Sequence, residues 1–504
     1  MKRALRFLLW PFLASQLAVA AAMGAETNFD FETLSARAKA LAEKPYAPPK
    51  GEVPEWLRRL TYDELRLIEF GGQHSLWVEE KLPFMVQYLH PGFLFDKTVH
   101  LHEVRDGKAR PIPFLAEQFN YRSVKPGITP ETMGFAGFRL MFPFAGPRAR
   151  HNEVGSFAGA SYFRFLPRDA AYGLSARGLA INPGEPTPEE FPIFTEFWLE
   201  RVDPRAKSMN VYALLDSESV AGAYRFTIAP GASTVVQVKA AVYARKNPKV
   251  FGVAPLTSMF WHGENSDAAR DFRPEVHDSD GLLMQNGAGE WLWRPLVNPR
   301  HTRVSAFSDE DPRAFGLLQR DRNFENYQDL EASYHARPSA WIEPIGKWGR
   351  GSVRLLELPT NRETDDNVVS FWVPETLPPP GQAIELEYRL HWFVDQIGPP
   401  AGFVRSTRHG KSAHYEPGFE RFVIDFDGKN LKAMAADAKI EHVVTVTGGG
   451  KLNHSSLQKN PINGTWRVAF TVKPDGSGKP IELRCFLRKT PDALTETWTY
   501  LWQP

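Results

Sequence analysis

Four short segments of the sequence place carboxylates among aromatic residues. They lie at 258–265, 275–281, 341–348 and 363–372, and Trp291 and Trp293 follow the second of them. Proteins bind sugar rings by apolar contact with aromatic faces and by hydrogen bonds from carboxylates, amides and arginines. Hydrolysis of a glycosidic bond requires two carboxyl groups, one acting as an acid and the other as a base or nucleophile. The four segments contain candidates for both tasks.

The same residue types also have a purely structural explanation. Acidic residues are common in turns, and a Trp in an all-β chain is more often part of the core than a platform for sugar. Composition alone therefore singles out no catalytic carboxylate. Seven residues within these segments are the candidate substrate-binding residues: Trp261, His262, Glu264, Asp280, Trp348, Glu363 and Asn367.

Residues for other kinds of chemistry are sparse. His100 and His102 would share one face of a strand, but no third ligand accompanies them, and 262–264 is not a zinc-binding helix motif. The sequence contains no Gly-rich phosphate loop, no dinucleotide fingerprint and no Gly-x-Ser-x-Gly elbow. We therefore predict neither a metal site nor a cofactor.

The chain length and charge limit the fold and the partners. With 504 residues, the chain is longer than one hydrophobic core usually serves, so two domains are expected. An apolar fraction of 42 % and an aromatic fraction of 12 % argue against disorder. A formal net charge of +1 provides no field to attract nucleic acid or an anionic membrane. A neutral substrate fits this charge balance better than a phosphorylated one.

The N-terminus has the three parts of a secretory signal peptide. Basic residues at 2, 3 and 6 precede an apolar run at 7–19, and small residues cluster at 20–25. The run is broken by Pro11 and is too short to span a membrane comfortably, and no other stretch approaches the length of a membrane span. We assign 1–25 to a signal peptide of the general secretory type, because this segment contains no Arg-Arg pair. No stable membrane insertion is expected for the mature protein.

Beyond this segment the sequence predicts mainly β-strands. Leu34, Ala38 and Leu41 recur at helical spacing and predict a short helix that ends before Pro45, and a second short helix is expected over 62–70. Elsewhere apolar and polar residues alternate with period two, which places one set on a core face and the other in water. The clearest alternating segments are 224–228, 234–243 and 384–390.

A turn-rich stretch with few apolar residues, near 394–410, predicts a domain boundary. We assign 26–395 to a first domain, 396–410 to a linker and 411–504 to a second domain. In the second domain, about seven short alternating segments are typical of an immunoglobulin-like sandwich. Cys485 is the only cysteine and alternates with Leu483 and Leu487, so we expect a buried strand residue and no disulfide.

Nine stretches spread over nearly the whole mature chain carry a resemblance to a known family. They lie at 90–95, 161–164, 172–180, 191–198, 258–265, 273–282, 324–334, 363–372 and 421–426. On these stretches the sequence resembles the OpgG/OpgD family, also called MdoG, of osmoregulated periplasmic glucan biosynthesis proteins. Their number and their order make the resemblance specific.

The resemblance implies a fold, a location and a substrate. The implied fold is all-β, with a large N-terminal β-sandwich that carries a long cleft and a smaller C-terminal immunoglobulin-like sandwich. The implied location is the periplasm, and the implied role is in making β-1,2-linked glucose backbones. The partners would be the β-1,2-linked glucan and the inner-membrane glucan synthase, with no nucleic acid. Some members resemble inverting endo-β-1,2-glucanases, whose general acid maps to Asp366 and general base to Asp278, with Asp280 as the second choice.

This assignment has physical requirements. An inverting enzyme separates its carboxyl groups by roughly 6.5–9.5 Å, so that a water fits between base and sugar. The acid needs a raised pKa, to which a charge on Asp365 would contribute. Many family members carry Asn at that position, and on a strand Asp365 and Asp366 would point to opposite faces. The alternative function is a non-catalytic glucan-binding scaffold that presents nascent glucan for branching or release; we favour hydrolysis.

Overall fold

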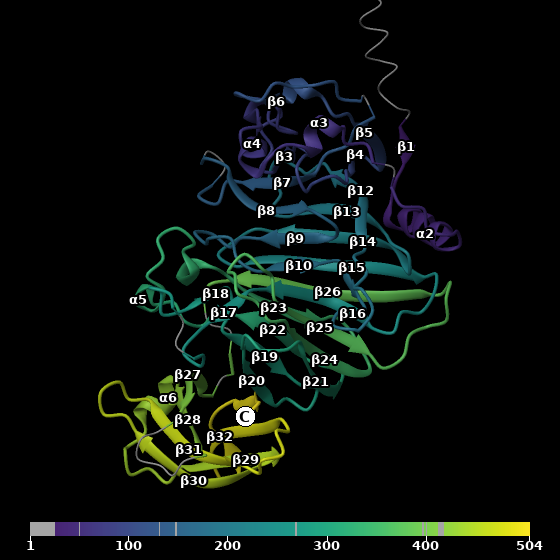
Figure 1. Cartoon of the computed structure of the whole chain (residues 1–504). Helices are drawn as coiled ribbons and strands as arrows, with labels where there is room; N and C mark the ends of the chain where they lie inside the picture. Colours follow the sequence, from purple (N-terminus) through teal and green to yellow (C-terminus); the bar gives the residue numbers. More distant parts are fainter. Residues whose placement is uncertain are drawn as a thin grey trace, which may run out of the picture.

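The computed structural model describes residues 26–49, 51–130, 132–146, 149–267, 270–395, 398–399, 401–411 and 418–504. The predicted signal peptide lies outside these residues, as do positions 396, 397 and 400 of the predicted linker. Figure 1 shows a large body of strands with a smaller C-terminal domain beneath it. The predicted all-β class is confirmed, since strands dominate and the helices are few and short. Within the described ranges, no helix has the length and apolar character needed to cross a membrane.

One sheet runs through most of the molecule, and its centre is antiparallel. The central strands are β14 (Val220–Ala229), β15 (Thr234–Ala244), β26 (Ala383–Phe393) and β23 (Ser339–Pro344). The predicted alternation explains the pairing of β15 with β26: Val236 lies opposite Leu390 and both are buried, while Gln237 lies opposite Arg389 on the other face. The outer strands of the large body are β1 (Thr27–Asn28), β5 (Lys108–Ile112), β4 (His100–Arg105), β12 (Ile193–Glu200) and β13 (Met209–Asp216) on one side, and β22 (Ala314–Leu318), β19 (Gly281–Gln285) and β20 (Trp291–Pro295) on the other.

A second sheet packs against the first and completes the sandwich of the large body. Its strands in order are β21 (Arg303–Glu310), β24 (Arg350–Glu357), β25 (Val368–Pro374), β16 (Phe251–Ser258), β10 (Ser175–Arg177), β9 (Tyr162–Phe165), β8 (Asn152–Ala158), β7 (Gly137–Phe142) and β3 (Met85–Leu89), with β11 (Leu179–Ile181) also beside β16. Aromatic rings join the two sheets: Phe163 of the second sheet lies 5.1 Å from Phe226 and 6.1 Å from Trp392 of the first, measured between ring centroids. These rings belong to one continuous hydrophobic core.

The helices are short, and the longest, α2 (Phe31–Ala42), packs on one face of β13, β14 and β15. Helix α2 matches the first predicted helix: the carboxylate of Asp30 accepts the N–H of Thr33 at 2.7 Å, and Leu34 packs inward. Helix α4 (Tyr62–Arg66) is shorter than the predicted 62–70, because residues 69–70 form β2 (Glu69–Phe70) paired with β6 (Phe119–Asn120). The remaining small elements are α3 (Glu55–Arg58), α5 (Phe324–Tyr327), α6 (Lys429–Ala433), η1 (Gly72–His74), η2 (Ala116–Gln118), η3 (Tyr334–Ala336) and the pair β17 (Phe260–His262) and β18 (Val276–His277).

The C-terminal domain has two facing groups of strands. One contains β27 (Phe403–Gly410), β28 (Glu420–Asp427), β31 (Trp466–Pro474) and β30 (Gly450–Lys459), and the other β29 (Glu441–Gly448), β32 (Ile481–Lys489), β33 (Asp492–Ala493) and β34 (Thr497–Trp502). β27 occupies the second half of the predicted linker, and a bulge between Val404 and Ser406 interrupts the alternation that would have identified this strand. Cys485 is buried in β32, as predicted.

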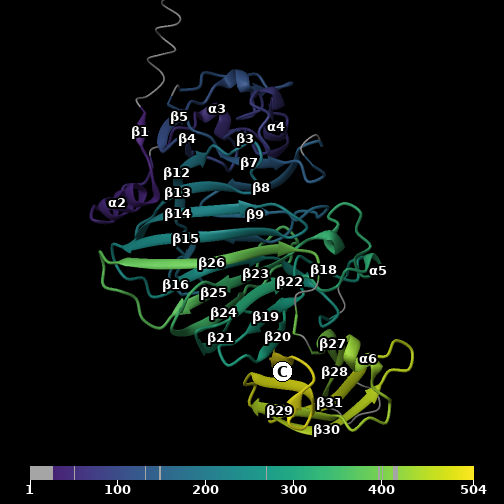
Figure 2. The same cartoon turned by 180° about the vertical axis from the view of Figure 1, so that it is seen from behind.

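The two domains share a sheet and a core. β34 pairs in parallel with β20, so the largest sheet continues into the C-terminal domain. Trp293 and Leu318 of the large body belong to the same buried cluster as Trp498 and Leu483. Figures 1 and 2 both place β17, β18 and α5 at the side of the large body that lies next to β27. The C-terminal domain is therefore docked directly against the segments that carry the acidic residues.

Replacing Trp498 should strongly destabilise this shared core. The Trp498 side chain is fully buried, stacks on Tyr500 at 5.5 Å and donates its indole N–H to Thr407 at 2.9 Å. We expect Trp498→Ala to lower the free energy of unfolding by about 3–5 kcal/mol, measured by urea denaturation. Trp502→Ala is the control, because Trp502 is only partly buried. Equal losses in the two variants would contradict the shared-core description.

Candidate functional site

Asp278 and Asp366 are held on either side of one segment, 258–262. Asp278 directly follows β18, and its backbone N–H donates to the carbonyl of Met259 at 2.8 Å. Asp366 lies in the turn before β25, and the next residue, Asn367, bonds both backbone groups of Phe260, at 2.8 and 3.0 Å. The carboxamide of Asn367 has an acceptor oxygen and a donor N–H group, so it matches the backbone donor and acceptor of Phe260 at once. Residues far apart in the sequence are thus fixed at one place.

Arg337 links the two carboxyl groups electrostatically. Its guanidinium forms an ion pair with Asp278 and stacks over the ring of Tyr334, 4.3 Å from the ring centroid. The positive charge of Arg337 also lowers the pKa of Asp366, and the negative charge of Asp366 raises the pKa of Asp278. Coulombic effects weaken with distance and are largely screened beyond about 10 Å, so the three charged groups lie in one neighbourhood. Asp278, Asp366 and Arg337 therefore form one cluster, which we call the carboxylate cluster.

Asp366 has the surroundings of a general acid. It is exposed to solvent, and no hydrogen bond or ion pair to its carboxyl group is present among the described residues. The surrounding protein nevertheless desolvates the carboxyl group and raises its pKa, against the opposing charges of Arg164, Arg177 and Arg337. The carboxyl group of Asp366 is therefore open to solvent on one side and close to protein atoms on the other.

Asp278 is more enclosed. The residue is only 5 % exposed, and burial raises the pKa of Asp278, while the ion pair with Arg337 opposes that rise. Arg337 bonds Oδ1, and Oδ2 is not among the buried polar atoms that lack a partner. Among the described residues no hydrogen bond to Oδ2 is present, so Oδ2 is the oxygen left to accept a proton.

The neighbouring aspartates have other partners. Asp365 bonds Thr360 at 2.9 Å and Arg362 at 2.7 Å, interactions that lower the pKa of Asp365. Asp365 and Asp366 lie in a turn rather than on a strand, and the charge of Asp365 does raise the pKa of Asp366, as expected. Asp280 accepts backbone N–H groups of residues 320 and 321 and faces His277 instead of the carboxylate cluster.

Arg273 ties three loops together next to the carboxylate cluster. Its guanidinium bonds Asp271 at 2.9 Å, Asp329 at 2.8 Å and Glu363 at 2.6 Å, so it joins segments that are distant in the sequence. Glu363 also accepts the hydroxyl of Tyr334 at 2.6 Å. The predicted substrate-binding residue Glu363 therefore fixes the turn that carries Asp366, and its side chain remains partly exposed.

Two groups of aromatic rings are each built around an arginine near the carboxylate cluster: Arg273 bonds Glu363, and the charge of Arg177 acts on Asp366. Arg273 lies 5.9 Å from the ring of Trp261 and 5.6 Å from that of Phe272, which is 78 % exposed. Arg177 lies 5.1 Å from the ring of Tyr162 and 5.4 Å from that of Phe191, which is 48 % exposed. Exposed aromatic faces beside carboxylates suit the binding of sugar rings.

Three other predicted substrate-binding residues have structural partners. Trp348 lies apart from the carboxylate cluster: its ring packs on Trp372 and Tyr388, with centroids 6.2 and 6.1 Å apart, and its indole N–H donates to a backbone carbonyl. His262 is buried, and burial lowers the pKa of its ring. Glu264 reaches the C-terminal domain, where it bonds the backbone N–H of Thr407.

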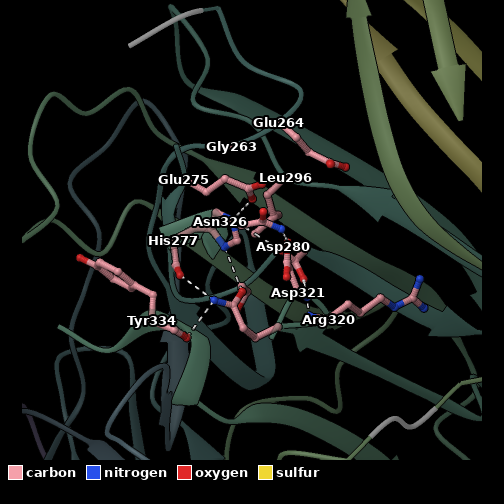
Figure 3. Close-up of polar contacts among 12 residues, drawn as sticks. Gly263, Glu264, Glu275, His277, Asp280, Leu296, Arg320, Asp321, Asn326 and Tyr334 are labelled. Atoms are coloured by element: carbon pink, nitrogen blue, oxygen red, sulfur yellow. Dashed lines mark hydrogen bonds and ion pairs between the residues drawn. The ribbon is translucent and has the colours of Figure 1, made fainter. Parts of the chain in front are cut away.

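One group of side chains in the described part of the chain has ligand atoms close enough together to hold a metal ion. It consists of Glu275, His277 and Asp280, whose ligand atoms lie within 4.8 Å of one another. Figure 3 shows their side chains together. The Nδ1 of His277 faces the Oε1 of Gln319 at 2.9 Å, and its Nε2 lies 2.8 Å from Glu275. Burial opposes a charge on His277, but the bond to Glu275 and the charge of Asp280 raise its pKa to about 9. A protonated ring with acceptors at both nitrogens accounts for this group.

Several residues of the site are not found by looking for carboxylates beside aromatic residues, although Arg177, Arg273 and Tyr334 fall in stretches that resemble the family. Arg337, Arg273 and Tyr334 reach the carboxylate cluster only through the tertiary fold, and their neighbours in the chain do not distinguish them from ordinary surface residues. Arg177 is similar, because it lies on a buried strand and pairs with Glu189. A search for carboxylates beside aromatic residues cannot find arginines whose partners lie dozens of positions away.

Comparison with known proteins gives a consistent result. The model of the family described as "Periplasmic glucan biosynthesis protein, MdoG" matches residues 29–502. A "Glucans biosynthesis protein G" from Ralstonia nicotianae is 46 % identical, covering 98 % of this chain and 99 % of the relative. A protein of the same name from Rhodopseudomonas palustris is 46 % identical over 96 % of each chain. A "Probable glucans biosynthesis protein D" from Shewanella oneidensis is 44 % identical, covering 95 % of this chain and 89 % of the relative. The chain therefore belongs to the MdoG family.

Proposed function

We propose that this protein acts in periplasmic glucan biosynthesis as an inverting endo-β-1,2-glucanase that cuts the glucan backbone. The names of its relatives and family support the role in glucan biosynthesis and the periplasmic location. One observation carries the enzymatic proposal. Asp366 is exposed, has a raised pKa and has no hydrogen-bond partner among the described residues. The charge of Arg337 acts both on Asp366 and on a second carboxylate, Asp278, with which Arg337 forms an ion pair.

In this proposal Asp366 is the general acid. The leaving sugar hydroxyl is a poor leaving group unless a proton reaches the glycosidic oxygen as the bond breaks. A carboxyl group with a raised pKa holds that proton closer to neutral pH, and the exposed position of Asp366 lets it meet the substrate. Within the described part of the chain, no hydrogen bond to the Asp366 carboxyl group has to break first.

Asp278 is the general base of the proposal. Arg337 opposes the effect of burial and favours the ionised form of Asp278, which a base requires. Its free Oδ2 takes the proton of a water that attacks the anomeric carbon from the face opposite the leaving group. The two carboxyl groups then have opposite protonation states before each turnover, although their chemical nature is the same.

The two aromatic groups would hold the polymer on either side of the scissile bond. One group contains Phe272 and Trp261 around Arg273, and the other contains Phe191 and Tyr162 around Arg177. The rings offer apolar surfaces, and the two arginines provide hydrogen-bond donors. A neutral glucan needs such apolar contacts, because it offers no charge for Coulombic attraction. An arrangement with sites on both sides suits a cut within the chain rather than at its end.

The experiment that tests the function is incubation of the purified mature protein with linear β-1,2-glucan. We expect shorter β-1,2-linked oligosaccharides from the wild-type protein and none from β-1,3- or β-1,4-glucans, with products resolved by chromatography. If the wild-type protein leaves β-1,2-glucan intact under conditions in which it binds the polymer, the enzymatic proposal is wrong.

The low exposure of Asp278 favours one alternative, a glucan-binding scaffold without catalysis. In that case the same site would hold nascent glucan and present it for branching or release, and the ion pair with Arg337 would be purely structural. Binding of β-1,2-glucan that is unchanged in Asp278→Asn and Asp366→Asn, with no cleavage by the wild-type protein, would support the scaffold.

Removing Arg337 should move the pH dependence of the reaction upward. Arg337 lowers the pKa of both carboxyl groups, so Arg337→Met raises both. The base must be ionised and the acid protonated, so both limbs of the pH profile of kcat/KM should move to higher pH, by about one pH unit or more. Arg362→Met is the control, since Arg362 is exposed and pairs with Asp365. A profile that keeps its position in Arg337→Met would contradict the shared-arginine description.

A further inference from the structure

Glu264 joins the segment beneath the carboxylate cluster to the C-terminal domain. Its carboxylate accepts the backbone N–H of Thr407 at 2.5 Å and pairs with the guanidinium of Arg408 at 2.8 Å, both in β27. Figure 3 shows the Glu264 side chain pointing away from His277. Glu264 was predicted from the sequence to bind substrate, but its carboxylate is already used at the domain boundary.

The segment that ends at Glu264 holds both carboxyl groups of the proposed reaction. Four residues before Glu264, the backbone of Phe260 is clamped by Asn367, the neighbour of Asp366. One residue earlier, the carbonyl of Met259 accepts the N–H of Asp278. A shift of this segment would therefore displace the acid and the base together.

A second connection runs from the base toward the same domain. Asp280, two residues after Asp278, accepts the backbone N–H groups of Arg320 and of residue 321. The guanidinium of Arg320 bonds Glu496 at 2.6 and 2.9 Å and lies 3.6 Å from the ring centroid of Trp293. Arg320 also donates to the carbonyl of Val404 in β27. Both connections end on the C-terminal domain.

We infer that Glu264 is a positioning residue through which the docked C-terminal domain sets the placement of Asp278 and Asp366. The inference rests on the proposed function and gives the C-terminal domain a task within it. Whatever binds or moves that domain would thereby change the geometry of the carboxylate cluster. A displacement of about 1 Å at reacting groups costs roughly a hundredfold in rate, so even a small slackening of this contact has a measurable effect.

The chain offers a closely matched control for Glu264. Glu290, in the turn between β19 and β20, also belongs to the large body and also binds one arginine and one threonine of the C-terminal domain. It pairs with Arg484 at 2.7 Å and accepts the hydroxyl of Thr497 at 2.8 Å. No hydrogen bond connects the turn of Glu290 to 258–264 or to the carboxylate cluster in the described residues. Glu264→Ala and Glu290→Ala thus each remove a contact with one arginine and one threonine of the C-terminal domain. Only Glu264 belongs to the segment that is hydrogen-bonded to Asp278 and Asn367.

The experiment measures kcat and KM on linear β-1,2-glucan together with amide hydrogen exchange. We expect Glu264→Ala to lower kcat about ten- to a hundredfold with KM nearly unchanged, and to speed exchange across 258–264 and at the amide of Phe260. Glu264→Gln should retain most of kcat, because the amide oxygen of Gln can still accept hydrogen bonds from the Thr407 N–H and from Arg408. Glu290→Ala should match the wild-type protein in kcat and in exchange of these amides.

Three results would overturn the inference. Glu264→Ala could behave as the wild-type protein, Glu290→Ala could lower kcat and speed exchange equally, or KM alone could rise in Glu264→Ala. The second would indicate general loosening of the domains, and the third direct contact of Glu264 with substrate. If the wild-type protein does not cleave the glucan, the proposed function fails, but the exchange comparison still decides whether Glu264 holds the 258–264 segment.

Discussion

Asp366→Asn should abolish nearly all hydrolysis of β-1,2-glucan while leaving binding intact. The amide keeps the size of the side chain but cannot donate a proton to the glycosidic oxygen, and loss of a general acid typically costs about 10²–10⁴-fold in rate. Asp366 has no hydrogen bond or ion pair among the described residues, so the substitution removes no structural contact. We expect kcat to fall by that factor and the thermal unfolding midpoint to stay unchanged.

The nature of the leaving group makes this prediction specific to an acid. A β-glucoside whose leaving group is a nitrophenol needs little protonation of the departing oxygen. On such a substrate Asp366→Asn should therefore retain a much larger fraction of the wild-type rate than it does on the natural glucan. The matched control is Asp365→Asn, because Asp365 is the adjacent aspartate and is bound to Thr360 and Arg362. Equal losses on both substrates, or equal losses in the two variants, would remove Asp366 from the role of acid.

Asp278→Asn should reduce hydrolysis to a similar extent but for every leaving group. A base activates the attacking water, and this step is needed whether or not the departing oxygen requires a proton. The amide oxygen can still accept a hydrogen bond from Arg337, which limits the damage to the fold. We expect kcat to fall about 10²–10⁴-fold on both natural and activated substrates.

An external nucleophile distinguishes a missing base from a damaged site. Azide attacks without surrendering a proton, so it should restore turnover of an activated substrate by the smaller variant Asp278→Ala and form the α-glucosyl azide. It should do nothing for Asp366→Ala acting on the natural glucan. Failure of azide to restore any turnover in a folded Asp278→Ala protein, verified by circular dichroism, would contradict the assignment of the base.

Local patterns in the sequence predict β-strands well where one face of the strand is buried and the other faces water. The alternation in β15 and β26 is read correctly because a core on one face and water on the other leaves a period of two. The same reasoning misses β27, whose bulge shifts the register, and extends α4 too far, because Glu69 and Phe70 pair with a strand that follows much later in the chain. Long-range pairing is invisible to a local window.

The candidate site divides in the same way. Asp278 and Asp366 come from the family resemblance rather than from spacing; in the structure Arg337 pairs with Asp278 and its charge also lowers the pKa of Asp366. Composition offered Trp348 and Glu264 as sugar contacts, yet one packs in the core and the other binds the C-terminal domain. Aromatic and acidic residues have several uses in a β-sandwich, and only their three-dimensional partners distinguish these uses.

The stereochemistry of the first product tests the central claim most directly. Proton NMR during early cleavage of linear β-1,2-glucan by the wild-type protein resolves the anomeric signal of the new reducing end before mutarotation. Attack by a water held at Asp278, on the face opposite Asp366, predicts that the α-anomer appears first. Initial release of the β-anomer would mean a covalent intermediate and retention, and would contradict the assignment of Asp278 and Asp366 as base and acid.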